Sequence, residues 1–103
     1  MAFANKTVDE VRLLTFDFST KAASGSTLSN PSVAVASVLS GTGVIGDLTL
    51  GTATVIDQTV TVLASAGTDG TRYRLKAEAD ASNGETLEVE RDLTVSDSSA
   101  VVA

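Results

Sequence analysis

A turn followed by a strictly alternating segment constrains the fold of this chain more than any other feature. Residues 67–70 are rich in turn formers, and residues 72–81 then place apolar and charged side chains in turn. The apolar side of this segment carries Tyr73, Leu75, Ala77 and Ala79. Because successive side chains of a β-strand point to opposite faces of its sheet, this period of two predicts a strand with one buried and one solvated face.

The position of the tyrosine narrows the type of β-structure. Tyr73 stands at the start of the strand, and Asp69 precedes it by four residues in the turn. In immunoglobulin-like sandwiches, a tyrosine at the start of a late strand bonds back to nearby backbone. Leu75 stands where antibody domains carry a cysteine, and the chain has no cysteine at all. We therefore expect a sandwich without the disulfide, with Asp69 and Tyr73 as structural corner residues.

The remaining chain contains further short segments with strand patterns, separated by turn residues. We expect strands at residues 11–18, from Pro31 onward, and at 47–50, 52–56, 58–65, 72–81 and 86–95. Their expected inward residues include Leu14, Phe16 and Phe18, then Val60, Val62 and Ala64, and finally Leu87, Val89, Leu93 and Val95. No helical period interrupts them, so the chain is predicted to be all-β. The fold would be an immunoglobulin-like antiparallel β-sandwich of about seven strands.

We place the sandwich at residues 11–96, between an N-terminal arm at 1–10 and a C-terminal tail at 97–103. The strand from Pro31 has small residues on both faces, which predicts that it is closely covered on both sides. The short segments 47–50 and 52–56 are expected at a sheet edge. Arg91 interrupts an apolar face, which indicates a bulge, a strand end, or a stem packed on the core with its charge in water.

Residue parity sets the turn between the last two strands. A two-residue Asn-Gly turn would place charged residues opposite apolar ones, whereas a three-residue loop, Ser82 to Gly84, keeps like faces together. Gly84 would then adopt the left-handed conformation, with Asn83 in the turn. In this register, two pairs of opposite charge face each other across the strands: Lys76 with Glu90, and Arg74 with Asp92.

Composition argues against several classes of function. The chain has no histidine and no cysteine, which removes the usual general base, thiolate nucleophiles and zinc–sulfur sites. No carboxylates have calcium-loop spacing, and a serine nucleophile would lack a histidine as its base. We therefore expect no metal, no cofactor and no catalytic residues. A net charge of −6 disfavours nucleic acid as a partner. No apolar run approaches the length of a membrane span, so we expect no membrane partner.

Three segments resemble a known family of small phage proteins. They are Asn5–Val11 with Thr15–Ser19, then Val60–Tyr73, and the turn Ser82-Asn83-Gly84. In these segments the chain is similar to bacteriophage fiber–tail adaptors, which are structural proteins of the virion. The resemblance implies a non-enzymatic adaptor at the head–tail or tail–fiber junction. It would act as a multimeric spacer between larger virion components.

The resemblance also implies partners and a location. The partners would be other virion proteins, such as the portal or tail adaptor, the tail fiber or the capsid, arranged as a symmetric multimer. The protein would reside in the virion after assembly in the bacterial host cytoplasm. The terminal arms have no evident core to join, so we expect Phe3, Lys6, Val101 and Val102 to contact a neighbouring subunit.

Two other functions remain open from the sequence. The first is a capsid decoration or cement protein, which the copy number per particle would distinguish from a junction adaptor. The second is an adhesion or carbohydrate-binding module. A carbohydrate-binding module would need an exposed aromatic platform. The chain has only Phe3, Phe16, Phe18 and Tyr73 as aromatic residues, and three of them belong to expected strands.

Overall fold

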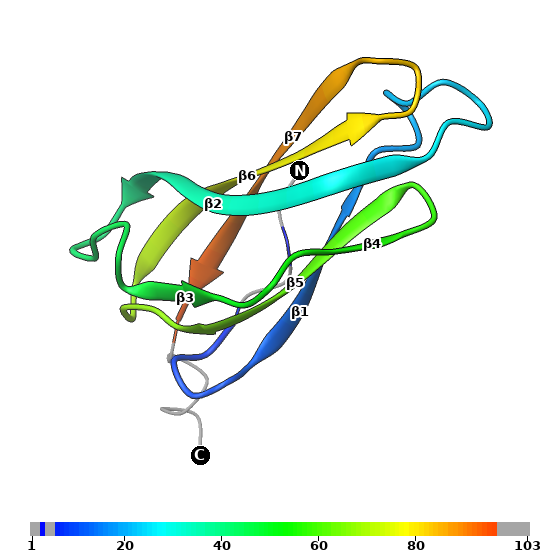
Figure 1. Cartoon of the computed structure of the whole chain (residues 1–103). Coiled ribbons are helices and arrows are strands. Elements are labelled where there is room, and N and C mark those ends of the chain that lie inside the picture. Colours follow the sequence, from blue (N-terminus) through cyan, green and yellow to red (C-terminus); the bar gives the residue numbers. More distant parts are fainter. Residues whose placement is uncertain (1–2, 4–5, 97–103) are drawn as a thin grey trace.

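The strands follow the alternating segments of the sequence. The computed structural model describes Phe3 and residues 6–96, and these described residues form seven β-strands and no helix (Figure 1). The strands are β1 Arg12–Asp17, β2 Leu28–Ser40, β3 Leu48–Leu50, β4 Thr54–Ile56, β5 Thr59–Ala66, β6 Thr71–Ala81 and β7 Thr86–Val95. The prediction of an all-β fold with about seven strands is confirmed.

The strands form two antiparallel sheets that pack face to face (Figure 1). In the first, called the β5 sheet, β1 pairs with one side of β5, and β3 and β4 pair one after the other with its other side. In the second, called the β6 sheet, the order is β2-β6-β7. An immunoglobulin constant-type sandwich divides its strands between two sheets in the same way, apart from its first strand. The predicted sandwich is therefore the fold observed.

The core consists of the inward residues of both sheets. Predicted inward residues that are buried are Leu14, Phe16, Phe18, Val60, Val62, Ala64, Tyr73, Leu75, Ala77, Ala79, Leu93 and Val95. Leu87 and Val89, which were also predicted to face inward, are partly buried and pack against this core. Fully burying a large apolar side chain contributes roughly 1.5–3 kcal/mol to folding. The period-two pattern therefore identified the residues that hold the two sheets together.

β2 corrects one prediction about coverage. It lies at an edge of the β6 sheet, where it pairs with β6 alone among the described strands. Val33 and Val35 pack against the core, but Ala34 and Ala36 on the other face are exposed. The expectation that β2 is covered on both sides was wrong. Small side chains suit a close contact, but they are equally compatible with an exposed edge face.

Pro31 lies inside β2 and not at its start. The pairing of β2 with β6 shifts between Ser29 and Ser32, and Asn30 in this interval has a φ of 51°. A bulge at an edge strand is one of the few places in a sheet that tolerate a proline, because no ladder hydrogen bond is required of it there. The strand therefore begins earlier than the proline suggested, at Leu28.

The short strands β3 and β4 lie at an edge of the β5 sheet, as predicted.

The strand pairing of β7 tests the explanations that the sequence left open for Arg91. The register between β6 and β7 runs without a shift from Thr71 opposite Val95 to Asp80 opposite Thr86, so a bulge is excluded. Arg91 shares the phase of the inward residues, and its Nη1 donates a hydrogen bond of 2.8 Å to the carbonyl of Thr15 on β1.

Candidate assembly surface

The corner around Tyr73 joins the two sheets. The Tyr73 side chain is fully buried, and its hydroxyl oxygen accepts a hydrogen bond of 2.8 Å from the backbone N–H of Thr68. Gly43 packs against this hydroxyl so closely that a Cβ there would lie 2.7 Å from it. Asp69 is exposed in the turn between β5 and β6. The corner thus fixes the connection between the sheets, and a larger residue at position 43 would disturb it.

The turn between β6 and β7 has three residues. The N–H of Ala81 donates to the carbonyl of Glu85 (2.7 Å), which closes the loop Ser82-Asn83-Gly84. Gly84 has a φ of 95°, a conformation that glycine adopts without a steric penalty. The Asn83 side chain accepts a hydrogen bond from the N–H of Glu85 and donates one to its carboxylate. The loop is exposed, so Asn83 and Gly84 set the register of β7 without contributing to the core.

Asp92 anchors the charges on the outer face of β6 and β7. Its two carboxylate oxygens accept hydrogen bonds from Arg72 (3.1 Å) and Arg74 (3.0 Å). Its side chain is 13% exposed, whereas the two arginine side chains are almost half exposed. The hydrogen bond from Arg74, with its positive charge and that of Arg72, holds the pKa of Asp92 below its ordinary value.

Lys76 lies opposite Glu90 in the register, but its ion pair is diagonal. The Lys76 ammonium lies 3.6 Å from the Glu88 carboxylate. Glu88 is itself directly opposite Glu78, which is an unfavourable pairing of like charges. A hydrogen bond between these two carboxyl groups raises the pKa of Glu78 and lowers that of Glu88.

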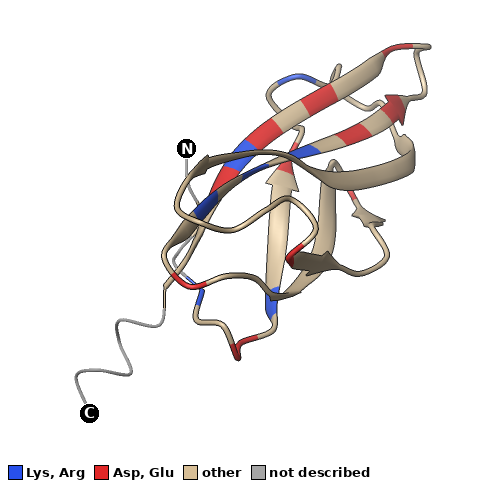
Figure 2. Ribbon diagram, turned by 90° about the vertical axis from the view of Figure 1, so that its left-hand side faces the viewer, with Lys and Arg blue, Asp and Glu red and all other residues tan. Residues whose placement is uncertain are grey.

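We call this surface the charged face. It comprises the outward residues Arg72, Arg74, Lys76, Glu78 and Asp80 of β6, with Glu88, Glu90 and Asp92 of β7. Figure 2 shows these charges as bands of both signs along the two adjacent strands. Most of its basic groups are paired within the chain, so the face provides little free positive charge for an anionic partner.

The outer face of the β5 sheet has the opposite chemistry. Leu13 of β1 lies directly opposite Leu63 of β5, and their exposed fractions are 60% and 52%. Ile56 of β4, opposite Thr59, is 54% exposed on the same side. The outward strand residues of this surface, which we call the neutral face, are Leu13, Thr15, Asp17, Thr49, Thr54, Ile56, Thr59, Thr61, Leu63 and Ser65. Asp17 is its only charged member.

Sequence reasoning missed the apolar part of the neutral face. The alternation assigned Leu14 and Val62 inward, which leaves Leu13 and Leu63 outward, but the outward leucines were not identified as a surface. The signal was available, because an apolar residue out of phase in a strand with a full inward phase must face solvent or a partner. That the two leucines meet depends on the pairing of β1 with β5, which alternation within one strand does not reveal.

Phe3 contacts its own chain. Its backbone N–H donates a hydrogen bond of 2.9 Å to the carbonyl of Asp92 at the edge of β7. Its ring packs edge-to-face against Phe16, with 5.2 Å between centroids, and the guanidinium of Arg91 lies 3.9 Å above the ring centroid. The expectation that this arm residue has no core to join is corrected.

Lys6 is fully buried within its own chain, although it was expected to contact a neighbouring subunit. It forms a parallel bridge with Val95, and its ammonium donates hydrogen bonds to the carbonyl oxygens of Ala66 (2.7 Å) and Thr7 (2.7 Å). A buried charge is tolerated only when hydrogen bonds replace its hydration. Lys6 is therefore held at the ends of both β5 and β7. The other two expected interface residues, Val101 and Val102, lie outside the described residues.

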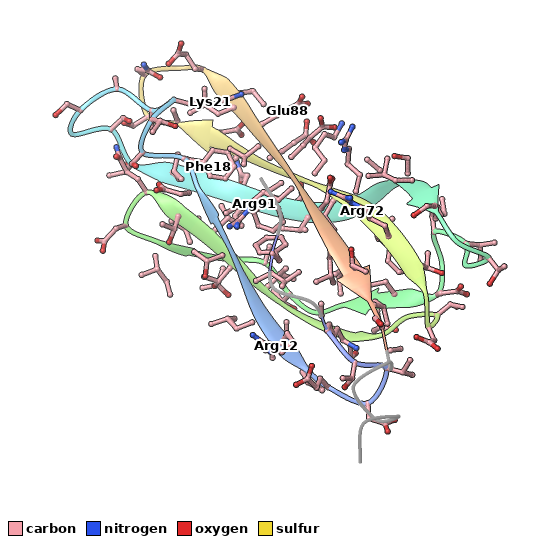
Figure 3. The ribbon with its side chains drawn as sticks, turned by 180° about the vertical axis from the view of Figure 1, so that it is seen from behind. Arg12, Phe18, Lys21, Arg72, Glu88 and Arg91 are labelled. Carbon is pink, nitrogen blue, oxygen red and sulfur yellow. The ribbon has the colours of Figure 1, made fainter. Side chains whose placement is uncertain are left out.

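Two strand edges and one hollow complete the surface. Phe3 and Lys6 cover the edge of β7 from Asp92 onward, and Lys21 donates a hydrogen bond of 2.6 Å to the carbonyl of Glu88. Figure 3 shows Lys21 and Glu88 at one end of the molecule, with Arg91 near β1. A hollow of about 260 Å³ opens here, lined by Asp17, Thr20, Val89, Glu90 and Arg91. On their outer sides, the N-terminal half of β7 and the whole of β2 are not paired with any described strand.

The described residues include no group of three acidic, histidine or cysteine side chains placed to hold a metal ion. Within the same residues, no helix is long and apolar enough to cross a membrane. The surface of the described residues has a charged face, a neutral face and two strand edges that are unpaired on their outer sides.

Comparison with known proteins identifies the family. No curated protein matches the chain. The family model described as podophage GP4 fiber-tail adaptor protein gp77 matches residues 6–96, which include all seven strands. A match over this span covers the corner, both sheets and both outer faces. The chain therefore belongs to the podophage GP4 fiber-tail adaptor protein gp77 family, whose members are structural adaptors of the phage virion.

Proposed function

We propose that this chain acts as a non-enzymatic, multimeric spacer that joins larger virion components at the head–tail or tail–fiber junction. The family match carries this proposal, because the family name describes an adaptor between tail and fiber. The fold supports it, since two packed sheets with a corner bonded through Tyr73 form a rigid body. A spacer has to hold its partners at a fixed separation, which a rigid body does without further ordering.

The neutral face is the surface on which we expect a larger virion component to pack. Interfaces of permanent assemblies are poor in charge at their centres, because desolvated charges must be matched individually. Leu13, Leu63 and Ile56 present exposed apolar area around threonines, with one carboxylate at the margin. Several copies in a symmetric arrangement would add their contacts, so no single contact needs to be strong.

The C-terminal segment remains a proposed contact. Val101 and Val102 would add apolar area to a neighbouring subunit. Phe3 and Lys6 are better assigned to the chain's own sandwich, because they contact Phe16 and Ala66. Deletion of residues 97–103 should therefore weaken particle assembly without lowering the melting temperature. Unchanged assembly after this deletion would argue against the contact.

The test is complementation of a phage that lacks this gene. We expect particles made without the protein to lack fibers, and particles made with it to carry fibers and a ring number of copies at the tail. Electron microscopy gives the position, and quantitative mass spectrometry of purified particles gives the copy number. A far larger copy number spread over the head would instead identify a capsid decoration protein. Complete, infectious particles without the protein would refute both roles.

A further inference from the structure

β2 presents a regular strand edge without charged residues. Its thirteen residues include no lysine, arginine, aspartate or glutamate, and its outer side is unpaired in the described structure. Strand edges are usually protected from pairing with other chains by charges, prolines or bulges. β2 has Pro31 and several shifts in its register, but residues 32–35 pair with β6 without a shift. This central stretch is therefore an unprotected template for another strand.

The edge of β7 is only half covered. Phe3 and Lys6 cover it from Asp92 onward, and their backbone hydrogen bonds use the even-numbered residues Asp92 and Thr94 of β7 and the Ser96 that follows it. Because hydrogen-bonding groups alternate sides along a strand, the backbone of Glu88 and Glu90 points to the same outer side. On that side, the Lys21 side chain donates a hydrogen bond to the Glu88 carbonyl, and no described strand pairs with it. The hollow lined by Val89, Glu90 and Arg91 leaves space beside this uncovered half.

We propose that copies of this chain join edge to edge, with β2 of one copy pairing with the uncovered half of β7 of the next. The two edges lie on opposite sides of one sheet, so each copy offers both halves of the contact. Such a head-to-tail contact generates a ring when its rotation closes. The inference rests on the proposed function, because it names the surface through which the multimer forms.

The chemistry of the two edges fits this pairing. The uncovered half of β7 carries Glu88 and Glu90, which would face like charges if two β7 strands met. The uncharged β2 strand avoids that repulsion. Strands β2 and β7 are both antiparallel to β6, so they run in the same direction. Neighbouring copies with similar orientations would therefore pair these strands in a parallel ladder.

A two-fold pairing of β2 with β2 is the main competitor. It is compatible with the charges, but it would close at a dimer and leave β7 half uncovered. Head-to-tail pairing uses both edges and can continue from copy to copy. The two arrangements predict different neighbours for Ala34, which is exposed on the outer face of β2. In the head-to-tail arrangement its neighbour is an outward residue of β7, such as Glu90.

Site-specific crosslinking separates these arrangements, since the chain has no cysteine of its own. We would introduce Ala34→Cys alone, Glu90→Cys alone, and both together, and treat assembled particles with a short bismaleimide linker that tolerates a shifted register. The double variant should give a ladder of covalent multimers on a denaturing gel, and each single variant should remain monomeric. Dimers from Ala34→Cys alone would overturn the proposal in favour of two-fold pairing. A double variant without a ladder would overturn it as well.

A second measurement tests the same contact without cysteines. Ala34→Glu and Ala36→Glu place negative charges on the outer face of β2, where the proposed pairing would set them beside the like charges of Glu88 and Glu90. We expect at least a tenfold loss of incorporation into particles, with an unchanged melting temperature. Ala23→Glu, at an exposed loop position, is the matched control and should be incorporated normally. Normal incorporation of both β2 variants would overturn the proposal.

The two proposals fail in different ways. If the wild-type protein is absent from particles, the adaptor function itself is refuted. If it is present in several copies, but the double cysteine variant gives no ladder, the adaptor function stands and the pairing of β2 with β7 is refuted.

Discussion

The charged face and the neutral face are the two outer faces of one sandwich, yet they differ in whether their side chains find partners within the chain. On the charged face, Arg72 and Arg74 share Asp92, and Lys76 pairs with Glu88. On the neutral face, Leu13 and Leu63 are each more than half exposed. The charged face therefore pairs its basic groups within the chain, whereas the neutral face gains free energy only when another surface covers it.

This difference determines which face is suited to permanent contact. Burying ion pairs against a partner requires removing water from every charge, and the Coulomb attraction often fails to compensate for that penalty. Covering leucines and threonines carries a much smaller penalty. The charged face would also keep the assembled particle solvated, because it remains in water in this arrangement. Substitutions on each face can test this difference separately.

The largest effect is expected on the neutral face. Leu63→Lys and Leu63→Glu should each reduce incorporation into particles by about thirtyfold or more, since truncating a central interface residue often costs 2 kcal/mol or more. Neither should lower the melting temperature much, because Leu63 is exposed in the monomer. Quantitative mass spectrometry of particles and thermal denaturation would measure the two effects.

The variants Leu63→Lys and Leu63→Glu carry opposite charges, so each is a control for the other. If loss of apolar contact is the cause, both variants should fail to incorporate, whereas an electrostatic cause would affect only one. Glu78→Gln, on the charged face, is the control for the other side and should incorporate normally. Normal incorporation of both Leu63 variants would show that the neutral face is not the contact surface.

The next largest effect is expected at the Tyr73 corner, which connects the two sheets. Tyr73→Phe removes the hydroxyl that accepts the Thr68 N–H at the turn between the two sheets. A buried donor left without its partner costs about 1–3 kcal/mol, so the free energy of unfolding should fall by about 2 kcal/mol. Chemical denaturation would measure this loss. An unchanged midpoint would show that the corner does not hold the two faces in place.

Asp92→Asn tests the pairing on the charged face. The substitution keeps the shape of the side chain but removes the charge that pairs with Arg72 and Arg74. We expect a loss of about 1 kcal/mol, because both guanidinium groups are almost half exposed and can turn to water. Asp17→Asn on the neutral face is the control and should have a smaller effect, because the exposed Asp17 carboxylate bonds to Ser19 and to no cationic side chain in the described ion pairs.

The same variant has a defined pH dependence. The pKa of Asp92 lies below its ordinary value of 3.8 in the folded state. Its stabilisation is therefore complete above that ordinary value and is lost as the pH falls through the folded-state pKa. The difference in stability between wild type and Asp92→Asn should thus be constant from neutral pH to about pH 5 and shrink below pH 3.8. A constant difference down to pH 2 would contradict the ion-pair explanation.

The core and the turns of the sandwich could be predicted from the sequence, because the alternation of apolar and polar residues indicates which side of a strand is buried. The inward set from Leu14 to Val95, the Tyr73 corner and the three-residue loop at Gly84 were all readable from local patterns. Each depends on residues close in sequence, or on a parity that a single turn transmits. The resemblance to fiber–tail adaptors also came from short segments, and the family match over residues 6–96 supports it.

The position of each strand in its sheet was not predictable in the same way. β2 was expected under cover on both sides but lies at an edge, because order in a sheet depends on pairing between distant segments. Lys6 illustrates a second limit. A lysine in a polar N-terminal segment normally faces water, and its burial depends on a carbonyl of Ala66, sixty residues away. The pairing of Leu13 with Leu63 likewise depends on two strands that are distant in sequence.

The smallest effect concerns the two like charges that face each other across β6 and β7. Glu78→Gln should stabilise the protein slightly at pH 7, because it removes one charge opposite Glu88 and supplies an N–H donor to its carboxylate. The pKa of Glu78 is raised, first by its hydrogen bond with Glu88, so the protonated form is the one that folding favours. This favourable contribution in the wild type is complete below the ordinary pKa of 4.5 and is lost as the pH rises through the folded-state value. The variant should therefore melt at a higher temperature than wild type at pH 7 and at the same temperature at pH 4. An equal gain at both pH values would show that the amide contact, and not relief of repulsion on the charged face, is responsible.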